Sequence, residues 1–232
     1  MTLITAHSGC DRTKDNSLEF IKYALNSKAD CLEVDVQKNN KGILVLSHDE
    51  ADNDAPHLET AFTMLKEYPD KKMNCDLKQK DLEIEIYKSA KRIGVEKQLI
   101  YSGNVNLGLI GKENNQLSQI DIFLNIEILC PEIDELCSWD NNKEYLYQEL
   151  NKAALETLKY EIKCINMDYH LCSDSFLVFL KENGILCSVW TVNEESEIKH
   201  FLERDIYNIT TRNVSYALTV KNDSGAVLRF TK

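Results

Sequence analysis

The residues of this sequence that are best suited to chemistry stand at the ends of short apolar runs. They are one histidine, three carboxylates, one lysine and one tryptophan, namely His7, Glu33, Asp35, Asp76, Lys78 and Trp190. If the apolar runs are parallel strands, their carboxyl ends meet at one rim and bring these side chains together. Three neighbouring carboxylates repel one another, and a hard cation such as Mg²⁺ or Ca²⁺, which takes oxygen ligands, relieves that repulsion. Such an ion can polarise a phosphoryl oxygen and neutralise charge that develops on it.

A second histidine, His48, is expected at the same rim. The segment 37–42 joins two strand-like runs and has turn chemistry, which predicts a β-hairpin. A four-residue turn pairs Lys38 with Ile43 and thereby sets His48 opposite Glu33. Because strand side chains alternate between two faces, His48 then points to the same patch as the carboxylates. Two histidines that titrate near neutral pH can serve as an acid–base pair.

The elements that must position these residues alternate between strands and helices. Nine strand-like runs cover residues 3–6, 31–36, 43–46, 72–77, 98–101, 120–126, 163–167, 185–189 and 205–209. Setting aside the return strand 43–46 leaves eight runs with mostly helical connections. This arrangement predicts an α/β fold, a TIM (β/α)8 barrel with a small β-hairpin insertion after the second strand. Amphipathic spacing predicts helices near residues 18–25, 82–93, 144–159, 176–180 and 196–202.

Composition sets limits on the class of protein. The chain has 232 residues, is 43% hydrophobic and shows no internal repeat or linker, so residues 1–232 are expected to form a single domain. No apolar run approaches the roughly 18 residues of a transmembrane segment. The first residues lack the features of a signal peptide, so a cytoplasmic location is expected. The eight cysteines include no CxxC pair, which favours reduced thiols over a zinc site or a disulfide framework.

The net charge of −11 argues against nucleic acid as a partner, because an acidic surface repels phosphate backbones. It also gives no help in attracting an anionic phosphodiester. If a small-molecule phosphodiester binds here, local cations or one divalent cation must create the positive site. The sequence leaves the oligomeric state open.

Four segments resemble, in order, the HRG, PENT, E-x-D and HD motifs of the glycerophosphodiester phosphodiesterase family: 7–9, 15–19, 33–36 and 48–49. Asp76-Leu77-Lys78 is similar to the family's E-L-K strand. Residues 189–193, followed by 206–211, are similar to its tryptophan strand and final strand. The resemblance covers most of the chain except about 102–160, and the order and spacing of the motifs carry it.

The resemblance implies a TIM barrel that hydrolyses glycerophosphodiesters to glycerol 3-phosphate and an alcohol, a reaction of lipid and glycerol metabolism. It implies one divalent cation, Mg²⁺ or Ca²⁺, on three carboxylates, with two histidines as acid and base. It further implies that a lysine holds a phosphate oxygen, and a tryptophan at a strand end suits a glycerol wall. The metal ligands that the resemblance implies are Glu33, Asp35 and Asp76, and the acid–base pair is His7 and His48. The lysine is Lys78 and the tryptophan is Trp190.

Three positions depart from the family pattern. Ser8 stands in place of an arginine that contacts the phosphate, and the nearby Arg12 could substitute for it. Asp76 stands in place of glutamate, and Thr211 in place of a frequent aspartate. Two alternatives therefore remain: a related phosphodiesterase acting on a lysophospholipid or a phosphosugar diester, and a catalytically decayed barrel that binds phosphate or metal without turnover.

Overall fold

Eight parallel strands form a closed ring in the computed structural model, which describes residues 2–51, 54–110, 117–118, 120–133, 143–204 and 206–227. Strand β1 pairs with β2 on one side and with β9 on the other, which closes the barrel. The described strands are β1 (Leu3–Ala6), β2 (Cys31–Lys38), β3 (Leu44–Leu46), β4 (Lys72–Leu77), β5 (Leu99–Gly103), β6 (Asp121–Asn125), β7 (Cys164–Asp168), β8 (Leu186–Trp190) and β9 (Asn208–Thr211). The predicted TIM barrel is confirmed, and each strand lies within a few residues of its predicted run.

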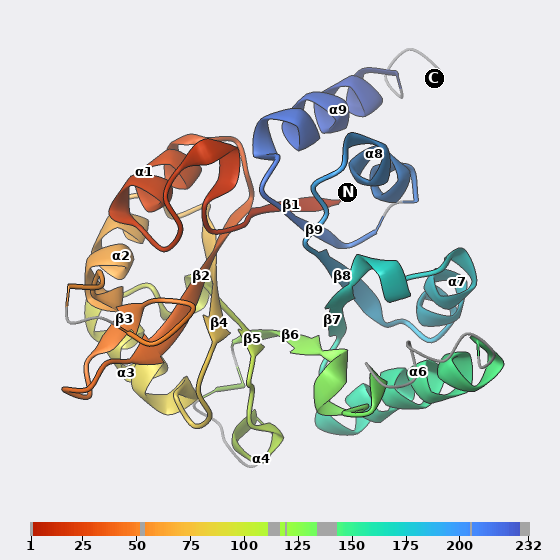
Figure 1. Ribbon diagram of the computed structural model, residues 1–232, viewed down its shortest axis with the longest axis horizontal. Helices are drawn as coiled ribbons and strands as arrows, with labels where there is room; N and C mark the ends of the chain where they lie inside the picture. The colour runs from red at the N-terminus through yellow and green to blue at the C-terminus, as the bar shows by residue number, and fades with distance from the viewer. Residues whose placement is uncertain are drawn as a thin grey trace.

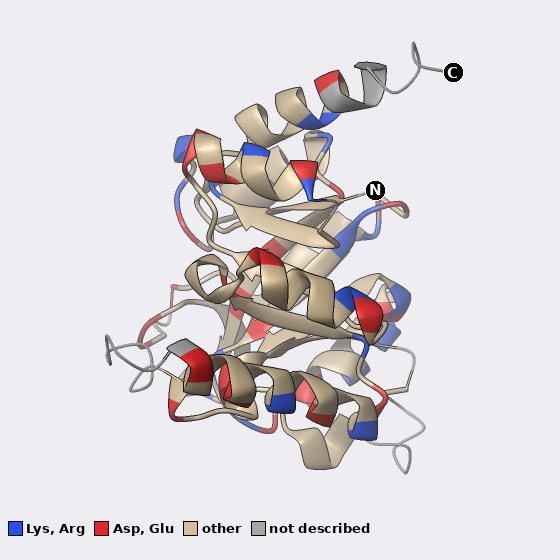
Figure 2. Ribbon diagram, turned by 90° about the vertical axis from the view of Figure 1, so that its right-hand side faces the viewer, with Lys and Arg blue, Asp and Glu red and all other residues tan. Residues whose placement is uncertain are grey.

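Helices surround the ring of strands (Figure 1). They are α1 (Leu18–Asn26), α2 (Leu58–Leu65), α3 (Glu83–Ile93), α4 (Leu107–Ile110), α6 (Lys143–Thr157), α7 (Asp174–Glu182), α8 (Glu195–Glu203) and α9 (Val214–Val227). Residues of both charges lie along these covering helices (Figure 2). The five predicted helices are present, whereas the sequence analysis did not anticipate α2, α4 or α9. In the described part of the chain, no helix has both the length and the apolar composition needed to cross a bilayer.

The hairpin strand β3 extends the wall of the barrel beyond the ring. On one side of β2, Cys31 and Leu32 pair with β1, and further along Val36–Lys38 pair antiparallel with β3. The carboxyl half of β2 therefore projects past the end of β1, with β3 alongside it. The segment that follows β3 consequently leaves the sheet at the carboxyl rim of the barrel.

Alternation along β2 separates an apolar face from a polar one. Leu32, Val34 and Val36 pack in the apolar cluster between the strands and the first helices. The intervening Glu33 and Asp35 face the interior of the barrel, because strand side chains alternate. Both faces are covered, so all these residues are buried.

The barrel interior is polar above an apolar floor. A small separate apolar cluster contains Cys31, Ile100 and Cys164, near the amino ends of their strands, and Phe123, in the middle of β6. Hydrogen-bonded polar side chains also line the interior: Thr5 donates to Asn208 at 2.7 Å, and Asn208 donates to Ser188 at 2.9 Å. The interior of this barrel thus leads into a polar cavity at the carboxyl end.

Candidate active site

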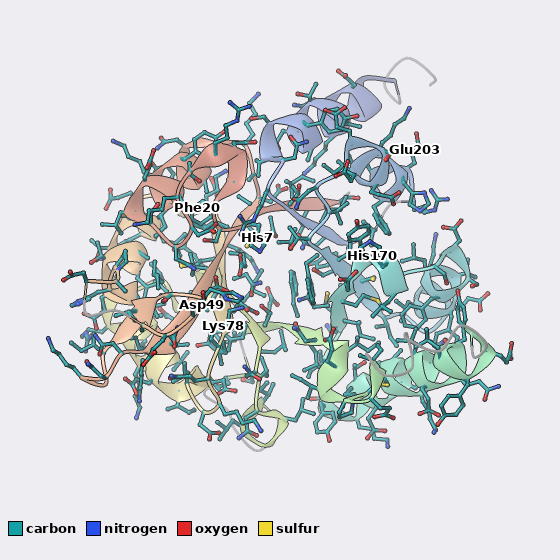
Figure 3. All side chains as sticks on the ribbon, viewed as in Figure 1. His7, Phe20, Asp49, Lys78, His170 and Glu203 are labelled. Carbon is teal, nitrogen blue, oxygen red and sulfur yellow. The ribbon has the colours of Figure 1, made fainter. Side chains whose placement is uncertain are left out.

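A cavity of about 530 Å³ opens at the carboxyl ends of the strands. All the predicted site residues except Arg12 line it: His7, Glu33, Asp35, His48, Asp76, Lys78 and Trp190. His7 and Lys78 lie toward the middle of the molecule, whereas Glu203 lies at its periphery (Figure 3). Residues far apart in sequence thus converge here because each except His48 belongs to, or directly follows, a barrel strand.

The acidic cluster of Glu33, Asp35 and Asp76 lies at the centre of this cavity. Asp35 and Asp76 are direct neighbours across the β2–β4 pairing, and Glu33 lies two residues earlier on the same face of β2. One carboxylate oxygen from each residue lies within 4.8 Å of the other two. Burial first, and then repulsion from Asp35 and Asp76, raises the pKa of Glu33 well above its usual range. The cluster therefore concentrates negative charge that the folded chain only partly neutralises.

Asp35 is held in place by Asn16, which follows the first strand. Asn16 Nδ2 donates to Asp35 Oδ2 at 2.7 Å, and its Oδ1 accepts the backbone N–H of Asp35 at 3.0 Å. The buried Ser8 accepts the N–H of Asn16 at 2.6 Å through its hydroxyl oxygen. Ser8 also donates its own backbone N–H to Glu33 Oε2 at 3.2 Å. Ser8 thus stabilises the acidic cluster through one direct hydrogen bond to Glu33 and through Asn16, which holds Asp35.

Asp76 is held by Ser102 and Lys78. Ser102 Oγ donates to Asp76 Oδ1 at 2.7 Å, and the Lys78 ammonium lies 2.6 Å from Asp76 Oδ2 and 2.8 Å from Asp35 Oδ1. Burial alone lowers the pKa of Lys78, but the carboxylates of Asp76 and Asp35 outweigh it and raise the pKa overall. Lys78 therefore remains charged and bridges two of the three acids.

The donor set of the cluster fits a hard divalent cation. Oxygen ligands on opposite sides of Mg²⁺ or Ca²⁺ are separated by roughly 4–5 Å, and these three oxygens all lie within 4.8 Å of one another. All three donors are carboxylates, the ligand type that such ions prefer. A cation among them would also relieve the repulsion that raises the pKa of Glu33.

His7 presents one ring nitrogen to the acidic cluster. Its Nδ1 lies 2.7 Å from the carbonyl oxygen of Ser8. Because a carbonyl can only accept, Nδ1 carries the proton, and Nε2 of the neutral ring is left as the basic atom. Nε2 lies 3.9 Å from Glu33 Oε2. Burial lowers the pKa of His7, and Arg212 lowers it further, against the opposing effect of the Ser8 carbonyl.

His48 lines the cavity as predicted, but the hairpin register and the position of His48 relative to the strand differ from the prediction. The observed register pairs Val36 with Leu46, so the predicted pairing of His48 with Glu33 is wrong by one residue. The turn is shorter than predicted, because Asn39 already pairs with Ile43 through an N–H···O bond of 3.0 Å.

Strand β3 ends at Leu46, so His48 lies in the loop beyond it and strand alternation does not govern its direction. Its side chain is 66% exposed, and its Nδ1 lies 3.0 Å from Asp49 Oδ1. Both residues line the cavity. His48 thus stands at the mouth, whereas His7 is deeper.

The predicted phosphate contact from Arg12 does not appear at this cavity. Arg12 is exposed and is not among the lining residues. Arg212, directly after β9, does line the cavity, and its Nη2 lies 3.1 Å from Asp15 Oδ1. The sequence analysis missed Arg212, although its place one residue after the final strand was a usable signal.

Trp190, at the end of β8, lines both this cavity and a second one of about 740 Å³. Asp76, Lys78 and Asn125 also line both cavities. The second cavity has apolar walls that the first lacks, including Leu107, Ile128 and Pro131. The acidic cluster therefore adjoins a polar chamber on one side and a more apolar chamber on the other.

No protein-family model and no curated protein sequence matches the chain. Solved structures do match it in shape. A glycerophosphodiester phosphodiesterase from Parabacteroides distasonis is 16% identical with a TM-score of 0.71, covering 97% of this chain and 98% of that one. One from Thermotoga maritima is 20% identical with a TM-score of 0.60, covering 95% and 98%.

A third match is an Oleispira antarctica phosphodiesterase solved in complex with the product sn-glycerol-3-phosphate. It is 14% identical with a TM-score of 0.69, covering 96% of this chain and 97% of that one. These identities are low, so the likeness is one of fold over nearly the whole chain. The chain has the TIM-barrel fold of solved glycerophosphodiester phosphodiesterases.

Proposed function

We propose that this chain is a metal-dependent phosphodiester hydrolase that cleaves glycerophosphodiesters to glycerol 3-phosphate and an alcohol. The observation that carries the proposal is the acidic cluster with two histidines in one cavity, at the end of the barrel where TIM-barrel enzymes act. The fold shared with glycerophosphodiester phosphodiesterases supports it.

In this proposal Glu33, Asp35 and Asp76 hold one divalent cation, either Mg²⁺ or Ca²⁺. When bound, such an ion polarises a phosphoryl oxygen and offsets the charge that develops on it. Lys78, already charged and beside two of these acids, is placed to contact a phosphate oxygen. Trp190 provides an aromatic wall for the organic part of the substrate.

His7 and His48 act as acid and base in this scheme. One histidine takes the proton of the attacking hydroxyl while the new P–O bond forms. The other gives a proton to the leaving alkoxide as the old P–O bond breaks. The hydrogen bond of His7 to the Ser8 carbonyl fixes which of its ring nitrogens exchanges the proton. The exposure of His48 lets it meet a substrate at the mouth of the cavity.

A second candidate is a related phosphodiesterase that acts on a lysophospholipid. The adjoining cavity of about 740 Å³ favours it, because Leu107, Ile128 and Pro131 provide apolar walls that a hydrocarbon chain could contact. A screen that compares glycerophosphodiesters with lysophospholipids separates the two candidates, since only the second predicts a higher kcat/KM for the acylated substrate.

Turnover of a generic phosphodiester tests the proposed class of reaction. Bis-p-nitrophenyl phosphate should be hydrolysed when Mg²⁺ or Ca²⁺ is present and should be stable when EDTA is present. Glu33→Gln provides the matched inactive variant, because it keeps the size of the side chain and removes one anionic ligand. Absence of hydrolysis with either ion would favour a barrel that binds phosphate or metal without turnover.

A further inference from the structure

We propose that Arg212 supplies the guanidinium that binds the phosphate of the substrate, the role for which the sequence pattern offered only Ser8 or Arg12. This inference rests on the proposed phosphodiester chemistry. Arg212 directly follows β9, and the backbones of β1 and β9 run side by side, with the His7 N–H donating to the Thr211 carbonyl at 2.9 Å. The last strand therefore brings its arginine next to the histidine that ends the first strand.

The backbone of Arg212 is fixed on both sides. Its N–H donates to Asn193 Oδ1 at 2.9 Å, and its carbonyl accepts the N–H of Asp11 at 2.8 Å. The guanidinium then extends from an anchored point into the lining of the cavity. Anchoring of this kind lowers the main-chain entropy that the loop loses when the side chain binds a ligand.

Charge balance in the cavity favours an added cation for the substrate. The described lining contains five carboxylates, those of Asp15, Glu33, Asp35, Asp49 and Asp76, against the cations Lys78 and Arg212. Lys78 already contacts two of the acids. Arg212 pairs with one carboxylate and Lys78 with two, so Arg212 is the cation of this lining that is better able to bind an anionic phosphodiester.

The guanidinium keeps free donors for that contact. Among the residues that the structure describes, its ion-pair partner is Asp15, whose Oδ1 lies 3.1 Å from Nη2. An arginine side chain has five N–H donors in a planar fork that matches two phosphate oxygens. The side chain is 45% exposed, so a ligand in the cavity can reach it.

Gly9 makes room for the pair of Arg212 and Asp15. A Cβ added at Gly9 would stand 1.8 Å from Asp15 Oδ1 and 3.3 Å from Arg212 Nη1. The glycine of the first motif therefore leaves the space in which the ion pair packs against the loop after β1. Asp15 holds one end of the fork, and the guanidinium as a whole lines the cavity.

The test compares two arginines of the chain. Purified wild-type protein and the variants Arg212→Ala, Arg212→Lys, Arg12→Ala and Asp15→Asn are assayed with a glycerophosphodiester, and binding of glycerol 3-phosphate is measured by calorimetry. Thermal unfolding of each variant verifies that it is folded. Arg212→Ala should raise KM and the Kd of glycerol 3-phosphate roughly 10–100-fold, as expected for a lost hydrogen bond to a charged group. Arg212→Lys should fall between, since lysine keeps the charge and loses the fork.

Three results would overturn the assignment. They are a change below about twofold for Arg212→Ala, an effect of Arg12→Ala as large as that of Arg212→Ala, and an equal loss for Asp15→Asn, which would mean that the ion pair only holds the loop. If wild-type protein binds glycerol 3-phosphate but hydrolyses no phosphodiester, the proposed function fails and calorimetry still decides the role of Arg212. If wild-type protein hydrolyses a glycerophosphodiester but does not bind glycerol 3-phosphate, the KM values decide the role of Arg212. If it neither binds glycerol 3-phosphate nor hydrolyses a phosphodiester, both proposals fail.

Discussion

The Nε2 atom of His7 lies 3.9 Å from Oε2 of Glu33, while the opposite ring nitrogen is engaged by the carbonyl of Ser8. The end of β1 and the middle of β2 are thereby linked at the point where an acid–base group and an anionic cluster meet. His7 is 21% exposed and Glu33 is buried, so the contact lies in the deep part of the cavity. His48 lies at the mouth, which gives the two histidines different surroundings.

His7→Ala and His48→Ala should each lower kcat about 10²–10⁴-fold, the usual contribution of general acid–base catalysis. The double variant should lose less than the product of the two single losses, because both groups act on one reaction. Steady-state kinetics with a glycerophosphodiester measures all three.

His170→Ala provides the matched control for the histidine variants. His170 is 70% exposed, contacts Asp168, and is not among the lining residues of the cavity. Its kcat should equal that of the wild-type protein. Near-full activity of both His7→Ala and His48→Ala would contradict their assigned roles. Loss of metal binding in either variant, measured by calorimetry, would show that the histidine is a ligand.

Metal binding should stabilise the folded chain through the acidic cluster. At a cation concentration of 100 times Kd the expected stabilisation is about 2.7 kcal/mol, which corresponds to a rise in Tm of roughly 5–11 °C for a protein of this size. Glu33→Gln should reduce that rise, since it removes one of three carboxylates.

The same Glu33→Gln variant should not lower the Tm of the metal-free protein, because it also removes a buried charge that is repelled by Asp35 and Asp76. Glu67→Gln, at an exposed position, is the control and should behave as the wild-type protein. Thermal unfolding with EDTA, Mg²⁺ and Ca²⁺ measures the effect. An undiminished metal response in Glu33→Gln would remove this residue from the ligand set.

Two glycines with the same backbone conformation should respond differently to alanine. Gly42 and Gly103 have φ of 75° and 74°, but a Cβ at Gly42 meets nothing within 4 Å. At Gly103 it would lie 2.6 Å from the carbonyl oxygen of Leu77 and 2.7 Å from Asp76 Oδ1.

Gly42→Ala should therefore cost about 1–2 kcal/mol of unfolding free energy through backbone strain alone. Gly103→Ala should cost about 1–3 kcal/mol more through overpacking, and it should also lower activity by displacing Asp76. Chemical denaturation and kinetics of the two variants provide the comparison. Equal costs would show that the β4–β5 contact at Gly103 has room for a methyl group.

The described cysteines should be inert in the folded protein. All seven are free and buried, and burial raises the pKa of Cys10 and of Cys31 to about 12. Because the thiolate is the reactive form, iodoacetamide at pH 8 should modify these seven only after unfolding. Mass spectrometry of peptides from native and denatured samples makes the measurement, and rapid modification of Cys10 or Cys31 in the native sample would contradict it. Cys137 lies outside the described residues.

The strands were predictable because their apolar runs are short and each is bounded by polar residues. The helix α2 was missed although Leu58, Phe62 and Leu65 bury a helical face, because its eight residues give few repeats of the pattern. The register of the hairpin was missed because Asn39 pairs with Ile43 and makes the turn one residue shorter than predicted. The side chain of Asn39 supports this shorter turn by accepting the N–H groups of Lys41 and Ile43.

The residues of the acidic cluster were predictable because strand ends in a barrel converge by geometry. The supporting contacts of Asn16 and Ser8 were not, since they depend on the conformation of the loop after β1, where Asn16 has a φ of 50°. The exchange of Arg12 for Arg212 at the cavity is a tertiary effect. It depends on the closure of the barrel between β1 and β9, and the usable sequence signal was the place of Arg212 directly after the final strand.

Release of glycerol 3-phosphate from a panel of glycerophosphodiesters is the most direct test of the proposed reaction. Wild-type protein and Glu33→Gln are each incubated with Mg²⁺, with Ca²⁺ and with EDTA, and the product is quantified over time. The proposed function predicts release by wild-type protein with at least one cation, and a loss of at least about 10²-fold with EDTA or in Glu33→Gln. No release with either cation, or release that is unchanged by EDTA and by Glu33→Gln, would contradict it.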